Sequence, residues 1–176
     1  METSATLSSC DMYRYALRRR WSSGPAILFL MLNPSTADAH QDDPTITRCI
    51  SFAQRWGYGS LAVGNLFAFR ATFPLTLMRC SEPIGPENDH WLTALASEAD
   101  TLVAAWGNHG RLLGRSLEVS AMLPSLMCLG LTRRGEPRHP LYLPRSTELV
   151  PMATVSTSLS ITRSRDDRAG EPGSSA

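Results

Sequence analysis

Short apolar runs alternate with amphipathic stretches along this chain, the pattern of a parallel sheet whose strands are joined by crossover helices. The apolar runs predict strands at 26–32, 60–65, 101–105 and 126–129. The amphipathic stretches predict helices at 45–56, 86–98 and 108–122. The pattern therefore predicts an α/β fold with a mostly parallel, four-stranded sheet.

The helix at 45–56 has the clearest boundary signals. Asp42, Asp43 and Pro44 precede its apolar pattern, and Gly57 follows it. Acidic residues and proline are typical of the first turn of a helix, and glycine is typical of the position just past the last turn. We therefore expect the acidic stretch to begin this helix.

The length and composition indicate one folded domain. The chain has 176 residues and 43% hydrophobic content, enough for a single core. Apolar periodicity stops near Glu148, and the remainder is rich in serine and threonine and then in charge. That composition is typical of disorder. We expect a single domain at 11–150 and a disordered tail at 151–176.

Charge and cysteine content narrow the functional class. The 17 basic residues, all arginine, nearly balance 16 acidic ones, so a formal charge of +1 leaves no global field for nucleic acid. The four cysteines lack the spacing of a zinc site, which predicts free thiols in a reducing compartment. No apolar run approaches the roughly 20 residues of a membrane span, and the first residues lack a leader pattern. We expect a cytoplasmic protein without membrane contact.

Four polar motifs fall where the predicted strands end. They are Asn33-Pro34-Ser35, Asn65 to Arg70, Trp106-Gly107-Asn108-His109 and Arg138-His139-Pro140. In open parallel sheets, ligands bind outside the carboxyl ends of the strands, where loops diverge and helix N-termini present free N–H groups. One such motif is ordinary turn chemistry, but four on one edge predict a ligand site.

Two asparagines are the main candidates for binding. Asn33 offers both an acceptor and donors, although its side chain could simply cap its own loop. Asn65 could read a planar, base-like edge, with Phe67 or Phe69 stacked on the base and Arg70 near a phosphate. The alternative is that both phenylalanines belong to the core and Arg70 is solvated.

Two histidines are predicted to have different roles, one chemical and one structural. His139 lies in a loop after the last predicted strand, and Pro140 makes that loop rigid enough to aim the imidazole at the strand ends. His109 follows Trp106-Gly107 at a predicted helix start, where a structural hydrogen bond is the default interpretation. His139 is therefore the candidate for chemistry.

Clustered acidic residues at 38–43 suggest a metal site. Asp38, His40, Asp42 and Asp43 resemble a metal site, because hard cations bind clustered carboxylates. A run of carboxylates before a helix is more often used for capping and for favourable interaction with the helix dipole. We therefore predict no metal here, with metal binding kept as an alternative.

Several motifs together resemble an uncharacterised bacterial and phage family, domain of unknown function 1643. They are MLNPSTAD, DDPT, RCISFAQRWGYG, NLFAFRAT, PIGPEND, AWGNHG, LGLT and PRHPLYLP. The resemblance covers roughly Tyr13 to Leu149. It implies no activity by itself.

A second resemblance, in the order and placement of motifs, is to the uracil-DNA glycosylase superfamily. LNPS, GNLFAFR, AAWG and RHP follow successive predicted strands, as the motif series of that superfamily does. The resemblance implies a three-layer α/β/α fold, with Asn33 positioning the attacking water and His139 stabilising charge on the departing base. Asn65 would hold the base edge beside Phe67 or Phe69. The remaining substrate-binding candidates are Pro34, Ser35, Arg70, Trp106, Gly107, Asn108, His109 and Arg138.

The sequence thus leads to three functional hypotheses. The first is a glycosylase-like hydrolase that cleaves the N-glycosidic bond of a nucleobase in nucleic acid or a nucleotide, without metal or cofactor. The second is a non-catalytic nucleotide or nucleic-acid binding module on the same fold, favoured by the lack of a carboxylate at position 33. The third is a metal-dependent hydrolase centred on Asp38, Asp42 and Asp43.

Overall fold

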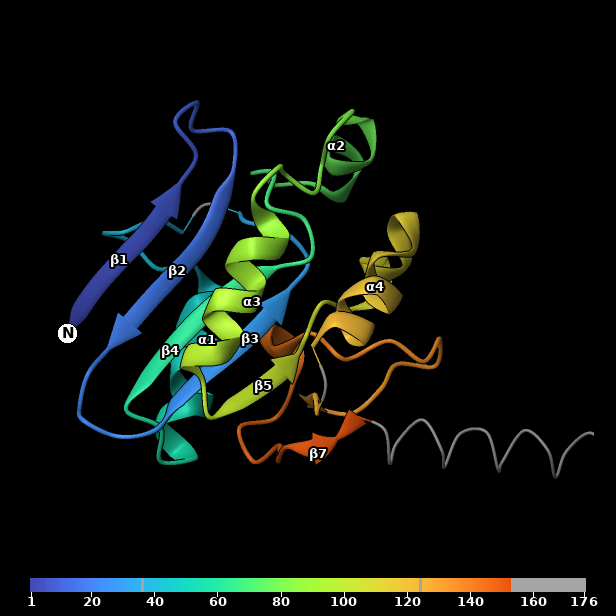
Figure 1. Cartoon of the computed structure of the whole chain (residues 1–176). Coiled ribbons are helices and arrows are strands. Elements are labelled where there is room, and N and C mark those ends of the chain that lie inside the picture. The colour runs from blue at the N-terminus through green and yellow to red at the C-terminus, as the bar shows by residue number, and fades with distance from the viewer. Residues whose placement is uncertain (36, 124, 153–176) are drawn as a thin grey trace, which may run out of the picture.

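The computed structural model describes residues 1–35, 37–123 and 125–152, which form a mixed α/β structure around one seven-stranded sheet (Figure 1). The strands are β1 (Glu2–Leu7), β2 (Arg14–Arg20), β3 (Ala26–Met31), β4 (Ser60–Asn65), β5 (Thr101–Ala104), β6 (Met127–Cys128) and β7 (Val150–Pro151). The helices are α1 (Pro44–Arg55), α2 (Pro74–Arg79), α3 (Asn88–Glu98) and α4 (Arg115–Met122), with 3-10 helices η1 (Asn108–Gly114) and η2 (Pro140–Tyr142).

The sheet has a parallel centre and antiparallel edges. Its order is β1-β2-β4-β3-β5-β6-β7, and the pairs β4–β3, β3–β5 and β5–β6 are parallel. The remaining pairs, β1–β2, β2–β4 and β6–β7, are antiparallel. The predicted α/β class is confirmed, but the prediction of a four-stranded sheet was wrong, because three antiparallel strands extend the four parallel ones.

The unpredicted strands lack the signal of an apolar run. β1 (ETSATL) is mostly exposed, and β2 (RYALRRR) has arginine at more than half of its positions. A segment with so many charged residues lacks the apolar pattern that predicts a strand. In the structure most of β2 is buried, and the head groups of Arg14, Arg18 and Arg19 reach partners on other segments.

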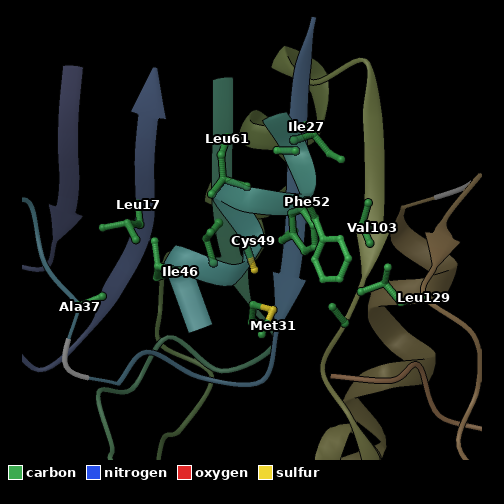
Figure 2. Packing of buried hydrophobic residues seen from close by; sticks show 14 of the residues in the cluster. Leu17, Ile27, Met31, Ala37, Ile46, Cys49, Phe52, Leu61, Val103 and Leu129 are labelled. Atoms are coloured by element: carbon green, nitrogen blue, oxygen red, sulfur yellow. The ribbon is translucent and has the colours of Figure 1, made fainter. Parts of the chain in front are cut away.

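Helices cover both faces of the sheet. On one face α1 packs Ile46, Cys49 and Phe52 onto the strands, as the close-up in Figure 2 shows. On the other face Leu92 of α3 and Val119 of α4 pack onto β3 and β5. The two core clusters are separated by the sheet, so the structure has three layers.

The helix predicted at 108–122 is two elements. Leu112 has an extended conformation and Leu113 a left-handed one (φ 54°), so η1 is kinked before α4 begins. Gly114 (φ 71°) adopts the left-handed conformation that glycine tolerates best. The apolar periodicity runs on across this break, which is why the sequence did not show it.

The structure places β1 ahead of the predicted domain start at residue 11, and β7 crosses the predicted end at 150. Of the predicted tail at 151–176, residues 153–176 lie outside the described residues. All four cysteines are free, as predicted. No helix in the described part of the chain has the length and apolar character needed to span a membrane.

We predict that Phe52→Ala lowers the free energy of unfolding by about 3–5 kcal/mol, because truncation leaves a void beneath α1. Phe52 is 2% exposed and stacks on Trp56 with ring centroids 5.1 Å apart. Urea denaturation measures the change. The matched control is Leu117→Ala on α4, where the side chain is 77% exposed and the change should stay within about 0.5 kcal/mol. Equal losses in both variants would contradict this assignment of the core.

Candidate functional site

A cavity of about 160 Å³ lies at the carboxyl ends of β3 and β4, beside the start of α1. Four predicted site residues line it: Asn33, Ser35, Asn65 and His139. Four further polar residues also line it: Arg14, Asp43, Thr45 and Thr72. The structure therefore brings together the first, second and fourth strand-end motifs.

Asn65 enters the cavity through strand alternation. Leu61 and Val63 of β4 pack in the core beneath α1, so Asn65, two residues further, faces the same side of the sheet. Its side chain is 1% exposed, and neither the amide nitrogen nor the oxygen has a hydrogen-bond partner within the described residues. An unsatisfied buried polar group costs about 1–3 kcal/mol, and a ligand that supplies both partners would recover it.

The main chain at Asn65 is held firmly from the opposite face. Asn88 Nδ2 donates hydrogen bonds to the carbonyl oxygens of Asn65 and Leu66, at 2.9 and 3.1 Å. Arg115 Nε donates to the same Leu66 oxygen at 2.9 Å. The Asn65 carboxamide is thus unpartnered while its backbone is anchored.

Asn33 closes the loop that follows β3. Its Nδ2 donates to the carbonyl oxygens of Pro34 (3.0 Å) and Ala71 (2.6 Å). Both amide hydrogens are therefore used, which leaves the Oδ1 atom as an acceptor. Ala71 N–H also donates to the Pro34 oxygen at 3.0 Å, so the loops after β3 and β4 form one wall of the cavity.

A bulge in β2 turns Arg14 into the cavity. Thr6 pairs with Ala16 but Leu7 pairs with Arg14, so Tyr15 is an extra residue in the strand. A bulge shifts the side-chain alternation by one position. Arg14 therefore faces the α1 side, and it lines the cavity with 2% of its surface exposed.

The Arg14 guanidinium carries a buried charge. Burial lowers the pKa of Arg14 to about 10, and the nearby Asp43 carboxylate opposes that shift. The group is therefore protonated at neutral pH. Its Nη1 donates to the Ala37 carbonyl oxygen, whereas Nε has no partner in the described residues.

His139 is a neutral donor in this setting. Its Nδ1 accepts a hydrogen bond from Leu141 N–H at 3.3 Å, so in the neutral ring the proton is on Nε2. Burial lowers the pKa of the imidazole below its ordinary 6.5, while Asp43 acts in the opposite direction. His139 can thus offer an N–H without carrying charge at neutral pH.

The start of α1 forms another wall. Asp43 caps the helix, with Oδ1 accepting from Ile46 N–H at 2.8 Å, and Pro44 occupies the first turn. Thr45 follows, on a helix end whose N–H groups favour negative charge. The sequence predicted this helix start and its capping but not that it faces the asparagines.

The predicted aromatic partners lie elsewhere. Phe67 is fully buried in the core on the α3 face, with Leu66 and Leu77. Phe69 packs edge-on against Tyr13, with centroids 6.0 Å apart. Neither lines the cavity, so the structure places both in the packing role that the sequence left open.

The Trp106-Gly107 motif supports the site without lining it. Trp106 is buried, and its Nε1 donates to the Glu136 carboxylate at 2.7 Å. Gly107 has φ 72°, and a Cβ added there would lie 3.9 Å from the His139 Cβ. Its N–H donates to the Pro137 oxygen at 2.9 Å. This motif thus anchors the loop that carries His139, a role that Glu136 shares and that sequence reasoning missed.

The remaining candidates lie apart from the cavity. Asn108 and His109 line a separate hollow of about 190 Å³ with Met78 of α2. Arg70 donates to the Asp11 carbonyl oxygen at 3.2 Å, and Arg138 is exposed. Pro34 is buried in the wall formed by its own loop. These side chains do not meet Asn33, Asn65 and His139.

The acidic residues have separate partners. Asp38 Oδ1 accepts from the N–H groups of His40 and Gln41, and Asp42 pairs with Arg19 at 2.8 Å. Asp43 caps α1. Within residues 1–35, 37–123 and 125–152 no group of three His, Cys, Asp or Glu could hold a metal ion. Their geometry favours structural roles.

Larger hollows exist but lack converging chemistry. One of about 560 Å³ lies between β2 and α3, where Arg18 and Glu98 form an ion pair at 2.9 Å. Another of about 440 Å³ near β7 is lined by serines and apolar groups such as Leu123 and Met152. The cavity of about 160 Å³ at the ends of β3 and β4 is the better candidate, because buried polar groups without partners line it.

Comparisons with known proteins give one match. The model of a family described as "Protein of unknown function (DUF1643)" matches residues 14–141, within the range that the sequence motifs indicated. No curated protein and no solved structure gives a significant match. The matched range runs from Arg14 to Leu141 and so includes every residue that lines the cavity.

We predict that Asn65→Leu keeps or raises the free energy of unfolding, by up to about 1–3 kcal/mol, because an apolar side chain of similar size removes an unsatisfied buried amide. The control is Asn88→Leu, which should lose about 1–3 kcal/mol because it removes the Asn88 donor to the Asn65 oxygen and one of the two side-chain donors to the Leu66 oxygen. Urea denaturation compares the two. Similar losses would show that Asn65 is structural.

We predict that His139 lowers the free energy of unfolding at acidic pH. Its pKa is lower in the folded chain, so the unfolded chain takes up the proton first and stability falls as the pH drops through 6.5. His139→Gln should therefore lose less unfolding free energy than the wild type between about pH 7.5 and about pH 5.5. The exposed His90 provides the control: His90→Gln should keep the wild-type dependence. If His139→Gln had the same pH dependence as the wild type, the lowered pKa of His139 in the folded chain would be refuted.

Proposed function

The chain belongs to the family of proteins of unknown function DUF1643, and because that description names no activity, we propose from the cavity that the protein hydrolyses the N-glycosidic bond of a nucleobase. The substrate is a base in nucleic acid or in a nucleotide, and the reaction uses no metal. We further propose that the fold is of the uracil-DNA glycosylase type and that the protein acts in the cytoplasm. The order of the strand-end motifs supports the first of these, and the four free thiols support the second.

The observation that carries the proposal is the unpartnered Asn65 carboxamide. A carboxamide presents a donor and an acceptor side by side in one plane. The edge of a nucleobase presents the complementary pair. A cavity of about 160 Å³ is smaller than the roughly 300–1,000 Å³ of sites for drug-sized ligands, which suits a single ring.

Asn33 is suited to position the attacking water. Its amide hydrogens are used by the Pro34 and Ala71 oxygens, so the Oδ1 atom has a defined orientation as an acceptor. A water that donates to this oxygen would be oriented towards the anomeric carbon of the sugar. The proton that this water loses on attack passes to the departing base anion, so the products are the free base and a sugar hydroxyl. Such positioning contributes to catalysis by lowering the entropic part of the barrier.

His139 is suited to stabilise the departing base. When the N-glycosidic bond breaks, the electron pair goes to the ring nitrogen and the base becomes anionic. A neutral Nε2–H donor, oriented by the hydrogen bond at Nδ1, stabilises that charge as it develops. Preorganised donors of this kind supply much of the rate enhancement in related chemistry.

The non-catalytic binding module is the second candidate. Position 33 is an amide rather than a carboxylate, so the side chain there cannot take a proton from water. A cavity with an amide at this position can bind a ring without turning it over. Binding of a base or nucleotide without release of the base would favour the binding module.

The test is a base-release assay. Single- and double-stranded oligonucleotides and nucleotides with uracil or modified bases are incubated with the protein, with and without chelator. We expect release that chelator leaves unchanged. The variants Asn33→Ala and His139→Ala should each lower the rate about 10²–10³-fold, the loss expected when one preorganised polar group is removed.

The control for the assay is His109→Ala, because His109 lines a different hollow and its loss should leave the rate unchanged. Thermal melting checks that each variant is folded. Binding without release supports the module instead of the enzyme. Release that chelator abolishes supports the metal-dependent alternative.

A further inference from the structure

Three arginines are buried in this fold, and one of them lacks a carboxylate partner. Arg19 is 1% exposed and pairs with Asp42 at 2.8 Å. Arg115 is 2% exposed and pairs with Asp89 and Glu118. Arg14 is equally buried, yet it takes part in none of the ion pairs of the described residues.

A buried cation without a counter-ion is expensive. Charged groups taken out of water are normally paired and hydrogen-bonded, because desolvation otherwise costs several kcal/mol. Among the described residues, the Arg14 guanidinium makes one hydrogen bond, from Nη1 to the Ala37 carbonyl oxygen, and its buried Nε has no partner. Its charge is therefore not balanced by a carboxylate of the described residues, and the cavity that it lines is the place for an anion.

The neighbouring charges do not remove this need. Asp43 lines the same cavity, but it lies outside ion-pairing distance of Arg14, and its Oδ1 accepts from Ile46 N–H. Arg19 and Arg70 add positive potential at Arg14, and Asp38 adds negative potential. The α1 N-terminus contributes a partial positive charge on the same wall as Asp43.

We infer that Arg14 is the counter-ion of an anionic ligand, and that the cavity holds its planar ring with the negative charge of the ring against this guanidinium. The ring identity rests on the proposed function, whereas the charge preference rests on Arg14 alone. Asn65 supplies the matching edge and Arg14 supplies the charge. The chemical class is thus an ionised cyclic imide or amide.

The test compares probes that differ in charge. Uracil is a neutral cyclic imide at neutral pH, barbiturate is a similar ring that is anionic there, and inorganic phosphate is an anion without a ring. Calorimetric titration of the full chain should show barbiturate binding at least about tenfold more tightly than uracil. Arg14→Gln should reduce that ratio to about one, because it removes the charge and keeps a polar side chain.

Two controls separate charge from folding. Arg18→Gln removes one positive charge from the same strand, at an ion pair with Glu98 away from the cavity, and should leave the ratio unchanged. Arg14→Lys keeps the positive charge and should retain part of the preference. Melting curves show whether each variant is folded. If Arg14→Gln is unfolded, the barbiturate-to-uracil preference of Arg14→Lys is the test of the role of Arg14.

Each outcome bears on a different claim. Uracil binding as tightly as barbiturate, or Arg14→Gln weakening both equally, overturns the role of Arg14 and leaves base recognition standing. Phosphate binding that needs Arg14, with no binding of either ring, supports the anion site and overturns base recognition. No binding of any probe overturns both.

Discussion

The parallel pairing of β3 with β4 is the constraint on which the candidate site depends. Main-chain hydrogen bonds align Met31 with Asn65, and the pairing continues past the strands, where Leu66 N–H donates to the Met31 oxygen. Because parallel strands end on the same edge, the loops after both strands meet there. The Asn33 side chain then joins these loops by donating to the Ala71 oxygen. The remaining walls of the cavity, from β2, the start of α1 and the His139 loop, pack around these two loops.

The polar groups buried at the cavity have fewer hydrogen-bond partners than those buried on the α3 face. On the α3 face, Asn88 and Arg115 donate to main-chain oxygens and Arg115 also pairs with carboxylates, although the Asn88 Oδ1 atom has no partner within the described residues. On the α1 face, Asn65 and Arg14 have equally little exposure but retain unpartnered atoms. Stability alone would favour partners or apolar side chains at both places. Single buried atoms without a partner also occur away from the cavity, at Arg48, Trp56 and Asn88, but among the described residues Asn65 alone has both carboxamide atoms without a partner.

The elements that the sequence predicted well were those with a local signal. The strand at 60–65 has the predicted bounds, and α1 begins one residue before the predicted start, at Pro44. The strands β1 and β2 were missed, since exposed residues in one and arginines in the other hide their pairing. The break at Leu113 was also missed, because a backbone kink leaves the apolar periodicity intact.

For the site, the sequence by itself determined three candidate side chains. Asn33 and Asn65 come at the ends of apolar runs, and His139 lies directly before Pro140 in the loop after the last predicted strand. Such placement is local. Only the tertiary structure decided that Arg14 joins them, since its direction depends on a bulge produced by pairing with β1. It likewise decided that Phe67 is core, because the face of a residue beyond a strand end depends on how the chain turns. Local periodicity specifies elements, whereas contacts between distant segments specify which side chains share a cavity.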